Sequence, residues 1–266
     1  MNSKTKVLTF LHFPKNAGTS IIYILRRSFP LGHVDVDPMD GHKAAIRAKD
    51  LELARRIYGK RLKSMAGHGL RMDTDFAAAG IEPDLFLLLR NPVSRCISWY
   101  QYRIQRRNRE KRDPHEAFSR KGASNFQTRR IAGEDNLQKA IDLIEERVRF
   151  VGLVERFDES LIGMREEFSE YDLKIDYRRQ NSARDNTLKE EIKANESLME
   201  LLHEKNQLDL DLCAYVEKRF FSSPEEQDEG QPGPKDPGLS SGVVANRMFR
   251  NLVYKSAVKK AKQKET

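Results

Sequence analysis

The sequence predicts an α/β fold in which helices flank a doubly wound parallel sheet and the C-terminal part of the chain is helical. Two features lead to this prediction. Short apolar runs alternate with segments of helical spacing, as expected when helices connect parallel strands. Between residue 187 and the break at residue 222 the spacing is helical, with expected core positions at Leu208, Leu212, Tyr215 and Phe220. Ligands of doubly wound sheets bind beyond the carboxyl ends of the strands, so a site is expected in the loops there.

The first predicted strand is the apolar run KVLTFLHF, which leads directly into the loop FPKNAGTS. Behind that loop, Ile21, Ile22 and Leu25 recur at helical spacing, and the basic residues lie off this apolar face. We therefore expect a strand, a loop and a helix in that order.

The second predicted strand, Leu85–Arg90, is apolar almost throughout, which is typical of a strand buried on both faces of a parallel sheet. Pro83 and the pair Asn91 and Pro92 bound it, and Pro92 suits the first turn of the helix that follows. A third apolar run predicts a strand at Phe150–Val154 and a helix directly after it.

Composition divides the 266 residues into three parts. Residues 1–221 carry the predicted strands and helices and are long enough for one large domain. Residues 222–242 contain four Pro and four Gly, which predicts a linker that builds no core. Residues 243–266 predict a basic C-terminal helix or tail.

The C-terminal segment places Val244, Met248, Leu252 and Val253 at helical spacing among basic residues. Three interpretations stay open for it. The segment docks on the domain as a helix, forms a solvated tail, or makes peripheral contact with a membrane surface or an anionic polymer.

The net charge of +8 is concentrated in two segments. Residues 103–130 hold ten Lys and Arg against three acidic residues, and residues 243–266 hold seven against one. Because these two excesses exceed the total, the remainder is acidic overall. A local excess favours contacts with anionic ligands or surfaces and argues against a protein that coats nucleic acid.

The N-terminus lacks the apolar core and the cleavage site of a signal peptide, and no apolar run reaches the length of a membrane span. The two cysteines, Cys96 and Cys213, are far apart in the sequence and are expected to be reduced thiols. These features predict a cytoplasmic protein.

The loop FPKNAGTS departs from the nucleotide triphosphatase pattern G-x-x-x-x-G-K-[ST]. Lys15 precedes the single glycine, Gly18, and Thr19 and Ser20 follow it. The glycine permits close approach of the backbone, the helix amides from Gly18 to Ile21 attract an anion, and the lysine adds a mobile charge. The next predicted strand ends in arginine where a magnesium-binding aspartate is expected. The loop therefore predicts a P-loop-like site that binds an anion through amides and cations without a metal.

A second anion site is predicted in RNPVSRCIS. Arg90 closes a buried strand, and Ser98 follows eight residues later on the next helix. A strand end and the first turns of the next helix converge in space, and an arginine can bind an anion with two donors. One ligand with two separated anionic groups fits both predicted sites.

Four segments together resemble carbohydrate sulfotransferases of the heparan sulfate 2-O-sulfotransferase type, in sulfotransferase family 2. FPKNAGTS is similar to the family's 5′-phosphosulfate loop, PKTAGTS, and LLLRNPVSRCISWYQYR to its 3′-phosphate motif, R-[DN]-P-x-x-R-x-x-S-x-[YW]. AGHGLRMD resembles the family's G-H segment, and FVGLVERFDESL its V-G-x-x-E-R-F-D segment. The four resemblances occur in family order across residues 7–220.

The resemblance implies a sulfotransferase that uses 3′-phosphoadenosine-5′-phosphosulfate (PAPS), releases PAP and needs no metal. Lys15 would stabilise the leaving phosphate at the bridging oxygen, and Arg90 and Ser98 would bind the 3′-phosphate. The polar segment YRRQNSARDN lies where the family closes over the adenine, although an ordinary basic loop fits it equally well. The implied donor-site residues are Lys15, Asn16, Ala17, Gly18, Thr19, Ser20, Arg90, Ser98, Asn181, Ser182 and Arg184.

The resemblance also implies that His68, in the G-H segment, is the general base. A neutral imidazole with an ordinary pKa near 6.5 can accept a hydroxyl proton. His12 is expected only to shape the loop. The acceptor is expected to be a carbohydrate or another hydroxyl compound, with an acidic glycan favoured by the arginines, although the stretch 103–130 is equally compatible with a mobile solvated loop. The expected acceptor contacts are Arg71, Arg106, Arg107 and Arg109, although Arg71 fits a donor contact or a solvent-exposed position equally well.

Two other classes of function remain open at this point. The chain could be a relative of P-loop nucleotide kinases, against which the displaced lysine and Arg90 argue. It could also be a non-catalytic module that binds anionic polymers through its basic segments, in which case His68 has no chemical role.

Overall fold

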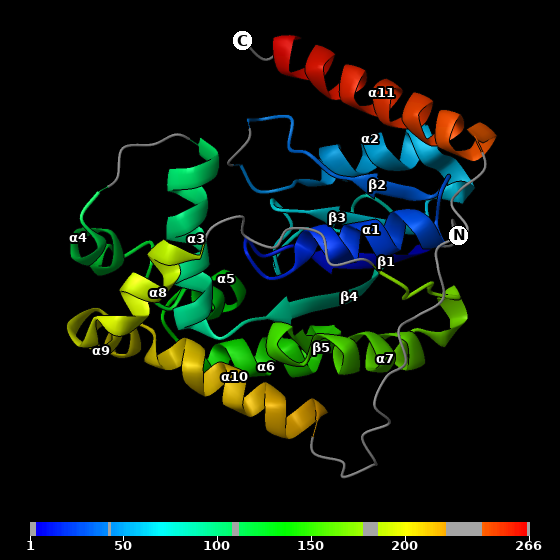
Figure 1. Cartoon of the computed structure of the whole chain (residues 1–266). Helices are drawn as coiled ribbons and strands as arrows, with labels where there is room; N and C mark the ends of the chain where they lie inside the picture. The colour runs from blue at the N-terminus through cyan, green and yellow to red at the C-terminus, as the bar shows by residue number, and fades with distance from the viewer. Residues whose placement is uncertain (1–3, 42–43, 108–111, 178–185, 222–240, 265–266) are drawn as a thin grey trace.

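The computed structural model describes residues 4–41, 44–107, 112–177, 186–221 and 241–264. Its centre is a five-stranded, all-parallel sheet of order β2-β3-β1-β4-β5, with helices on both sides (Figure 1). The α/β class and the parallel sheet are therefore confirmed. The strands are β1 Thr5–Leu11, β2 His33–Asp35, β3 Ser64–Gly67, β4 Ile81–Leu89 and β5 Val148–Leu153.

The helices cover the sheet and form a separate group beside it. Single-turn 3-10 helices occupy Gly59–Arg61, Val154–Arg156 and Ser169–Tyr171. The α-helices are α1 Gly18–Ser28, α2 Ala48–Tyr58, α3 Pro92–Arg107, α4 Pro114–Ser119, α5 Phe126–Ala132, α6 Leu137–Arg147, α7 Phe157–Glu167, α8 Thr187–Ala194, α9 Glu196–Lys205, α10 Gln207–Phe220 and α11 Ser241–Lys264.

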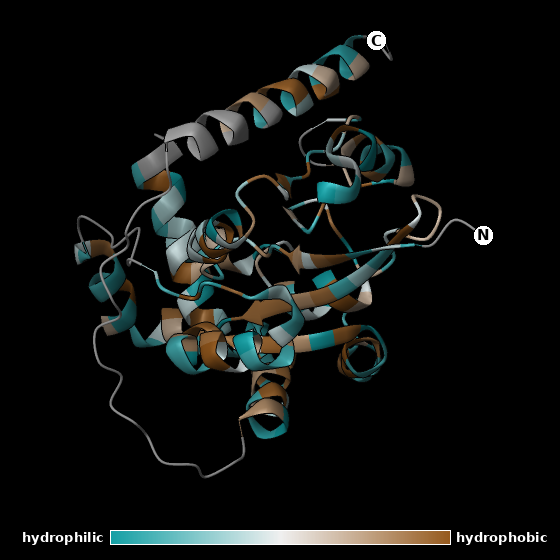
Figure 2. Cartoon of the chain, turned by 90° about the vertical axis from the view of Figure 1, so that its right-hand side faces the viewer, coloured by the Kyte–Doolittle hydropathy of each residue, from teal (hydrophilic) through white to brown (hydrophobic). Residues whose placement is uncertain are grey.

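The central strands are apolar on both faces, as the sequence predicts. In β4, Phe86 and Leu88 pack with α1 and α7, whereas Leu85, Leu87 and Leu89 pack toward α6 and α10 on the opposite face. Successive side chains of a strand point to opposite faces, so a continuous apolar run fills both layers. Figure 2 shows these apolar strands between the more polar helices. A third apolar cluster joins α3, α4, α8 and α9.

Strand β4 is longer than the sequence predicts, because it begins at Ile81 and includes Pro83. Pro83 pairs with Val7 of β1, but pairing with β5 starts only at Leu85. One side of the strand is therefore a local edge at Pro83, where the missing N–H costs no ladder hydrogen bond.

Helix α11 packs on α2 through Tyr254 and Val258, which are buried. The Tyr254 hydroxyl accepts a hydrogen bond from the Asp37 amide at 3.2 Å, and the Tyr58 hydroxyl donates to Asn251 Oδ1 at 3.0 Å. The apolar stripe identified in the sequence is not the docking face. Its members Met248, Leu252 and Val253 are exposed, and the side chain of Val244 lies outside the described residues.

Cys96 and Cys213 are free thiols, and burial raises the pKa of both. Within the described segments, no helix has both the length and the apolar character required to cross a membrane.

Candidate functional site

The loop between β1 and α1 has an unusual backbone. Lys15 and Ala17 adopt left-handed conformations, with φ of 72° and 54°. Each such placement costs a residue with a Cβ about 1–2 kcal/mol. Left-handed residues of this kind occur in the concave arrangements of successive amides that bind anions. The loop is therefore strained, and its conformation is one that suits the binding of an anion.

The first turn of α1 leaves donors available for a ligand. The Ser20 and Ile21 amides donate to the Ala17 carbonyl at 3.0 and 3.3 Å, so they are not free as the sequence interpretation assumed. Among the described residues, the amides of Gly18 and Thr19 and the hydroxyls of Thr19 and Ser20 have no hydrogen-bond partner. Four donors thus converge at the positive end of the helix dipole.

Asn16 fastens the loop to the sheet. Its side chain is fully buried, and Nδ2 donates to the Leu88 carbonyl and to Gln127 Oε1, both at 2.7 Å. The Asn16 side chain therefore positions the loop and faces protein groups.

Arg90 joins the loop to the end of β4. Its Nη1 donates to the Lys15 carbonyl at 2.9 Å. Gln127 of α5 accepts from the Arg90 amide at 2.9 Å and donates to the Arg90 carbonyl at 2.7 Å. The backbone N–H of Gln127 in turn donates to Oδ2 of the buried Asp209 at 3.0 Å. The two motifs, separated in sequence, are thus held side by side at neighbouring strand ends.

Arg90 and Arg95 form a cationic pair with little compensation by carboxylates. Arg95 is only 4% exposed and contacts the Cys96 sulfur at 3.5 Å and the Phe126 ring at 4.3 Å. The nearest carboxylate oxygen to Arg90, on Glu155, is 4.0 Å from its Nε. Burial lowers the pKa of Arg90, the charge of Glu155 opposes this, and the charge of Arg95 adds to it. The Nε atoms of both arginines are buried without a hydrogen-bond partner among the described residues.

His68 follows β3, beside the end of β1, because Leu11 and Gly67 are paired in the sheet. Its ring stacks on that of His12 with centroids 3.8 Å apart. His68 Nδ1 lies 3.0 Å from the His12 carbonyl oxygen. A carbonyl can only accept, so Nδ1 carries a proton, and in the neutral form of the imidazole the lone pair is on Nε2. The exposed imidazole is therefore held in the tautomer that a general base needs.

His12 shapes the loop from inside. Its ring also stacks on Phe10, with centroids 5.4 Å apart. Burial lowers the pKa of His12 to about 3, with the nearby His68 contributing, so its imidazole is neutral. A Cβ on Gly18 would lie 1.8 Å from His12 Nε2. The packing of His12 against the loop thus requires the glycine at position 18.

Arg71 and Arg130 hold the residues around His68. Arg71 Nη1 donates to the His68 carbonyl at 3.0 Å, and Arg130 Nη2 donates to the same oxygen. Both also reach the Leu70 carbonyl, at 3.4 and 3.2 Å. Neither arginine forms an ion pair within the described segments, and Arg130 Nε is buried without a partner. Two cations therefore lie next to the candidate base.

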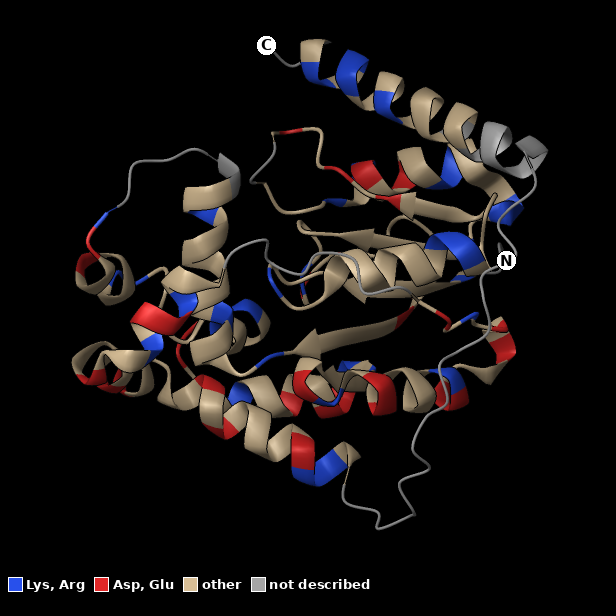
Figure 3. Ribbon diagram, in the orientation of Figure 1, with Lys and Arg blue, Asp and Glu red and all other residues tan. Residues whose placement is uncertain are grey.

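The remaining predicted residues lie around this group. Lys15 Nζ is 4.5 Å from the centre of the Tyr102 ring. Ser98 lies half-buried on α3, and its hydroxyl has no hydrogen-bond partner among the described residues. Figure 3 shows Lys and Arg gathered where α3 and α5 meet the end of β4. Outside the described residues lie Arg109, Asn181, Ser182 and Arg184 and the side chains of Arg106 and Arg107.

The basic stretch 103–130 is not a solvated loop where it is described. It contains the end of α3 and the helices α4 and α5, and Phe118, Gln127 and Thr128 are buried. The sequence analysis did not identify four residues that organise the site. Arg95 and Glu155 lie inside segments that resemble the sulfotransferase motifs, so those motifs could have pointed to them. Gln127 and Arg130 lie in the basic stretch, where no motif marks them.

In the parts of the chain that the structure describes, no three His, Cys, Asp or Glu side chains lie together as metal ligands would. The chain matches no protein-family model, and no curated protein matches it significantly.

Proposed function

We propose that the protein is a PAPS-dependent sulfotransferase with a P-loop-like sheet, which transfers a sulfuryl group to a hydroxyl of a carbohydrate. One observation carries the proposal. Arg90 Nη1 donates to the Lys15 carbonyl, so the loop after β1 and the arginine that follows β4 form one site at adjacent strand ends. PAPS carries anionic groups at its 5′ and 3′ positions, and such a site can bind both at once.

The donors divide between the two ends of the nucleotide. The amides of Gly18 and Thr19, with the hydroxyls of Thr19 and Ser20, suit the 5′-phosphosulfate. Arg90 and the hydroxyl of Ser98 suit the 3′-phosphate. Arg95 adds a buried positive charge beside Arg90, and no carboxylate of the described chain forms an ion pair with it.

The transfer is an in-line displacement at sulfur. The acceptor oxygen attacks sulfur while His68 Nε2 takes its proton, and the bond from sulfur to the bridging oxygen breaks. PAP leaves with the electron pair of that bond, and Lys15 stabilises the negative charge that develops on the bridging oxygen. The Nδ1 contact of His68 with the His12 carbonyl supports this role, because in the neutral imidazole it places the proton on Nδ1 and the lone pair on Nε2.

Arg71 and Arg130 favour an acceptor that carries negative charge near the reacting hydroxyl. Their guanidinium groups contact backbone carbonyls, which are neutral, so the positive charge remains available. A uronic-acid-containing or sulfated glycan supplies carboxylate or sulfate groups for them.

The test is transfer of labelled sulfate from PAPS to a panel of acidic glycans, neutral glycans and small alcohols. Replacing His68 by Ala should lower the rate about 10²- to 10⁴-fold, the usual range for a general base, while PAP still binds. His203→Ala, at an exposed histidine on α9, is the matched control and should keep full activity. Full activity of the His68→Ala protein would remove His68 from the mechanism. Absence of transfer to every acceptor, with PAP bound, would favour a non-catalytic binding module.

A further inference from the structure

Helix α11 is docked on the domain through one face only. Tyr254 and Val258 are 1% and 5% exposed, and Ala257 and Ala261 are partly buried beside them. These residues recur at intervals of three and four, which defines one side of a helix. Figure 1 shows α11 at the outside of the molecule, next to α2. Its inner side therefore already has a partner.

The opposite side of α11 is also apolar. Met248, Phe249, Leu252 and Val253 are 59%, 65%, 66% and 39% exposed. At about 100° per residue they lie opposite Tyr254 and Val258. The described residues expose five large apolar side chains, and only Ile162 lies elsewhere. We call these four residues the outer apolar face of α11; unlike apolar residues scattered singly over a surface, such a cluster indicates an interaction site.

Basic residues follow the outer apolar face along the same side of the helix. Residues 241–264 contain seven Lys and Arg and no acidic residue. Lys255 and Lys259 follow on the same side as Met248, and both are exposed. Within the described chain, neither forms an ion pair. The outward side of α11 thus passes from an apolar half to a cationic half.

The cavity between α2 and α11 adds to this charge. It has a volume of about 870 Å³, and its lining includes Arg55, Arg56, Lys60 and Lys260. Glu52 is the one acidic residue of the described chain that lines it. The surroundings of the helix therefore reinforce a positive potential.

We propose that the outer apolar face of α11, with Lys255 and Lys259, docks on a lipid bilayer that carries anionic headgroups. The apolar side chains enter the boundary between headgroups and acyl chains, and the lysines contact the headgroup phosphates. A second copy of the chain is a poorer partner for this face, because it brings another helix with seven cations and no acidic residue. Charge complementarity thus selects an anionic surface.

The experiment is sedimentation of the full chain with vesicles of phosphatidylcholine alone or mixed with phosphatidylglycerol. The protein should bind the mixed vesicles, and added salt should weaken that binding. Phe249→Ser with Leu252→Ser should weaken it about tenfold or more. Lys255→Gln with Lys259→Gln should weaken it about fivefold for each lysine. Both apolar side chains are about two thirds exposed, so the fold should tolerate their replacement.

Two matched controls remove the same chemistry elsewhere. Ile162→Ser replaces the exposed apolar residue of α7, and Lys121→Gln with Lys174→Gln removes two exposed lysines away from α11. Both should bind vesicles as the parent protein does. Failure of the parent protein to bind mixed vesicles would overturn the proposal, as would equal binding by all variants. A dimer in light scattering that Phe249→Ser with Leu252→Ser abolishes, without vesicle binding, would assign the face to a second copy instead.

Discussion

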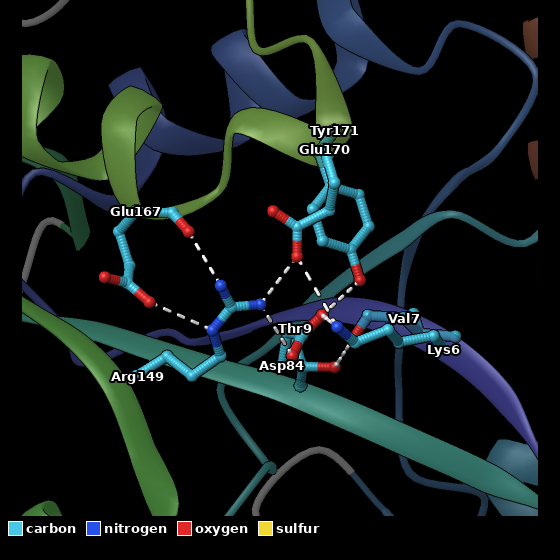
Figure 4. A network of polar contacts seen from close by, with 8 residues as sticks. All are labelled: Lys6, Val7, Thr9, Asp84, Arg149, Glu167, Glu170 and Tyr171. Atoms are coloured by element: carbon cyan, nitrogen blue, oxygen red, sulfur yellow. Dashed lines mark hydrogen bonds and ion pairs between the residues drawn. The ribbon is translucent and has the colours of Figure 1, made fainter.

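The cations at the two ends of the parallel sheet have different kinds of partners. Near the amino ends of the strands, Arg149 contacts Asp84 at 3.0 Å, Glu167 at 3.1 Å and Glu170 at 2.7 Å (Figure 4). Lys6 lies 3.4 Å from the other Asp84 oxygen, which also accepts a hydrogen bond from Tyr171. Every charge in this network has a partner of opposite sign.

At the carboxyl ends, the arginines contact mainly neutral groups, and Glu155 approaches Arg90 Nε only at 4.0 Å. Arg71, Arg90 and Arg130 donate to backbone carbonyls, and Arg95 contacts a sulfur and an aromatic ring. Carbonyls orient a guanidinium without neutralising it, so its charge stays available to an anion. A structural network and a candidate binding site therefore differ in what their cations contact, carboxylates in the first and mainly neutral groups in the second. The number of cations does not distinguish them.

Replacing Arg149 by Met tests how much the ion-pair network near the amino ends of the strands contributes to stability. The side chain of Asp84 is only 6% exposed and would keep Lys6 as its sole cation. Breaking a partly buried pair in this way should lower the free energy of unfolding by about 2 kcal/mol. Urea denaturation measures the loss, and PAP affinity should stay unchanged. A variant as stable as the parent protein would show that the network contributes nothing.

Acid titration tests the packing of the candidate site. The folded-state pKa of His12 is about 3, below the ordinary value of 6.5, so below pH 6.5 the unfolded chain takes up a proton that the folded chain does not. Stability should therefore fall as the pH drops from 6.5 toward 3, by up to about 1.4 kcal/mol per pH unit from this group. Urea denaturation at successive pH values gives this slope.

The control for the titration is the His12→Phe variant, which keeps an aromatic ring in the stack. Its stability should depend less steeply on pH in the same window, whereas His115→Phe, at an exposed position, should keep the parent slope. An unchanged slope in the His12→Phe variant would contradict the partly buried, neutral state of His12.

Replacing Arg95 by Met should change stability least. A buried cation without a carboxylate can often be exchanged for an apolar side chain at little cost, so the expected change is within about 1 kcal/mol. PAP affinity should nevertheless fall about tenfold, because a charge beside the 3′-phosphate is lost. Calorimetry with PAP measures the affinity. Large destabilisation with unchanged affinity would place Arg95 in the structural class with Arg149.

The parts predictable from sequence are those that local patterns define. Continuous apolar runs identified β1, β4 and β5, and the residues that follow the first two strands meet at one site. Strands β2 and β3, with three and four residues, are too short for periodicity to define. Which side of α11 docks could not be predicted, because both sides of the helix are apolar and periodicity alone does not distinguish them.

The organisation of the site could not be predicted, because it depends on contacts between distant segments. In the sequence, nothing distinguishes Gln127 from other polar residues of the basic stretch. In the fold, α5 places its side chain between Asn16 and Arg90. The need for Gly18 appears only once the His12 ring lies against it. Such roles arise from tertiary packing, which one sequence does not encode as a local pattern.

Thermal stabilisation by PAP and by ADP, measured without magnesium, shows whether the site binds a 3′-phosphate. A ligand that binds the folded state at about 100 times its Kd stabilises it by about 2.7 kcal/mol. PAP should raise the Tm, ADP should raise it far less, and Arg90→Met should remove most of the difference. Equal stabilisation of the parent protein by both nucleotides would contradict a site built for a 3′-phosphate.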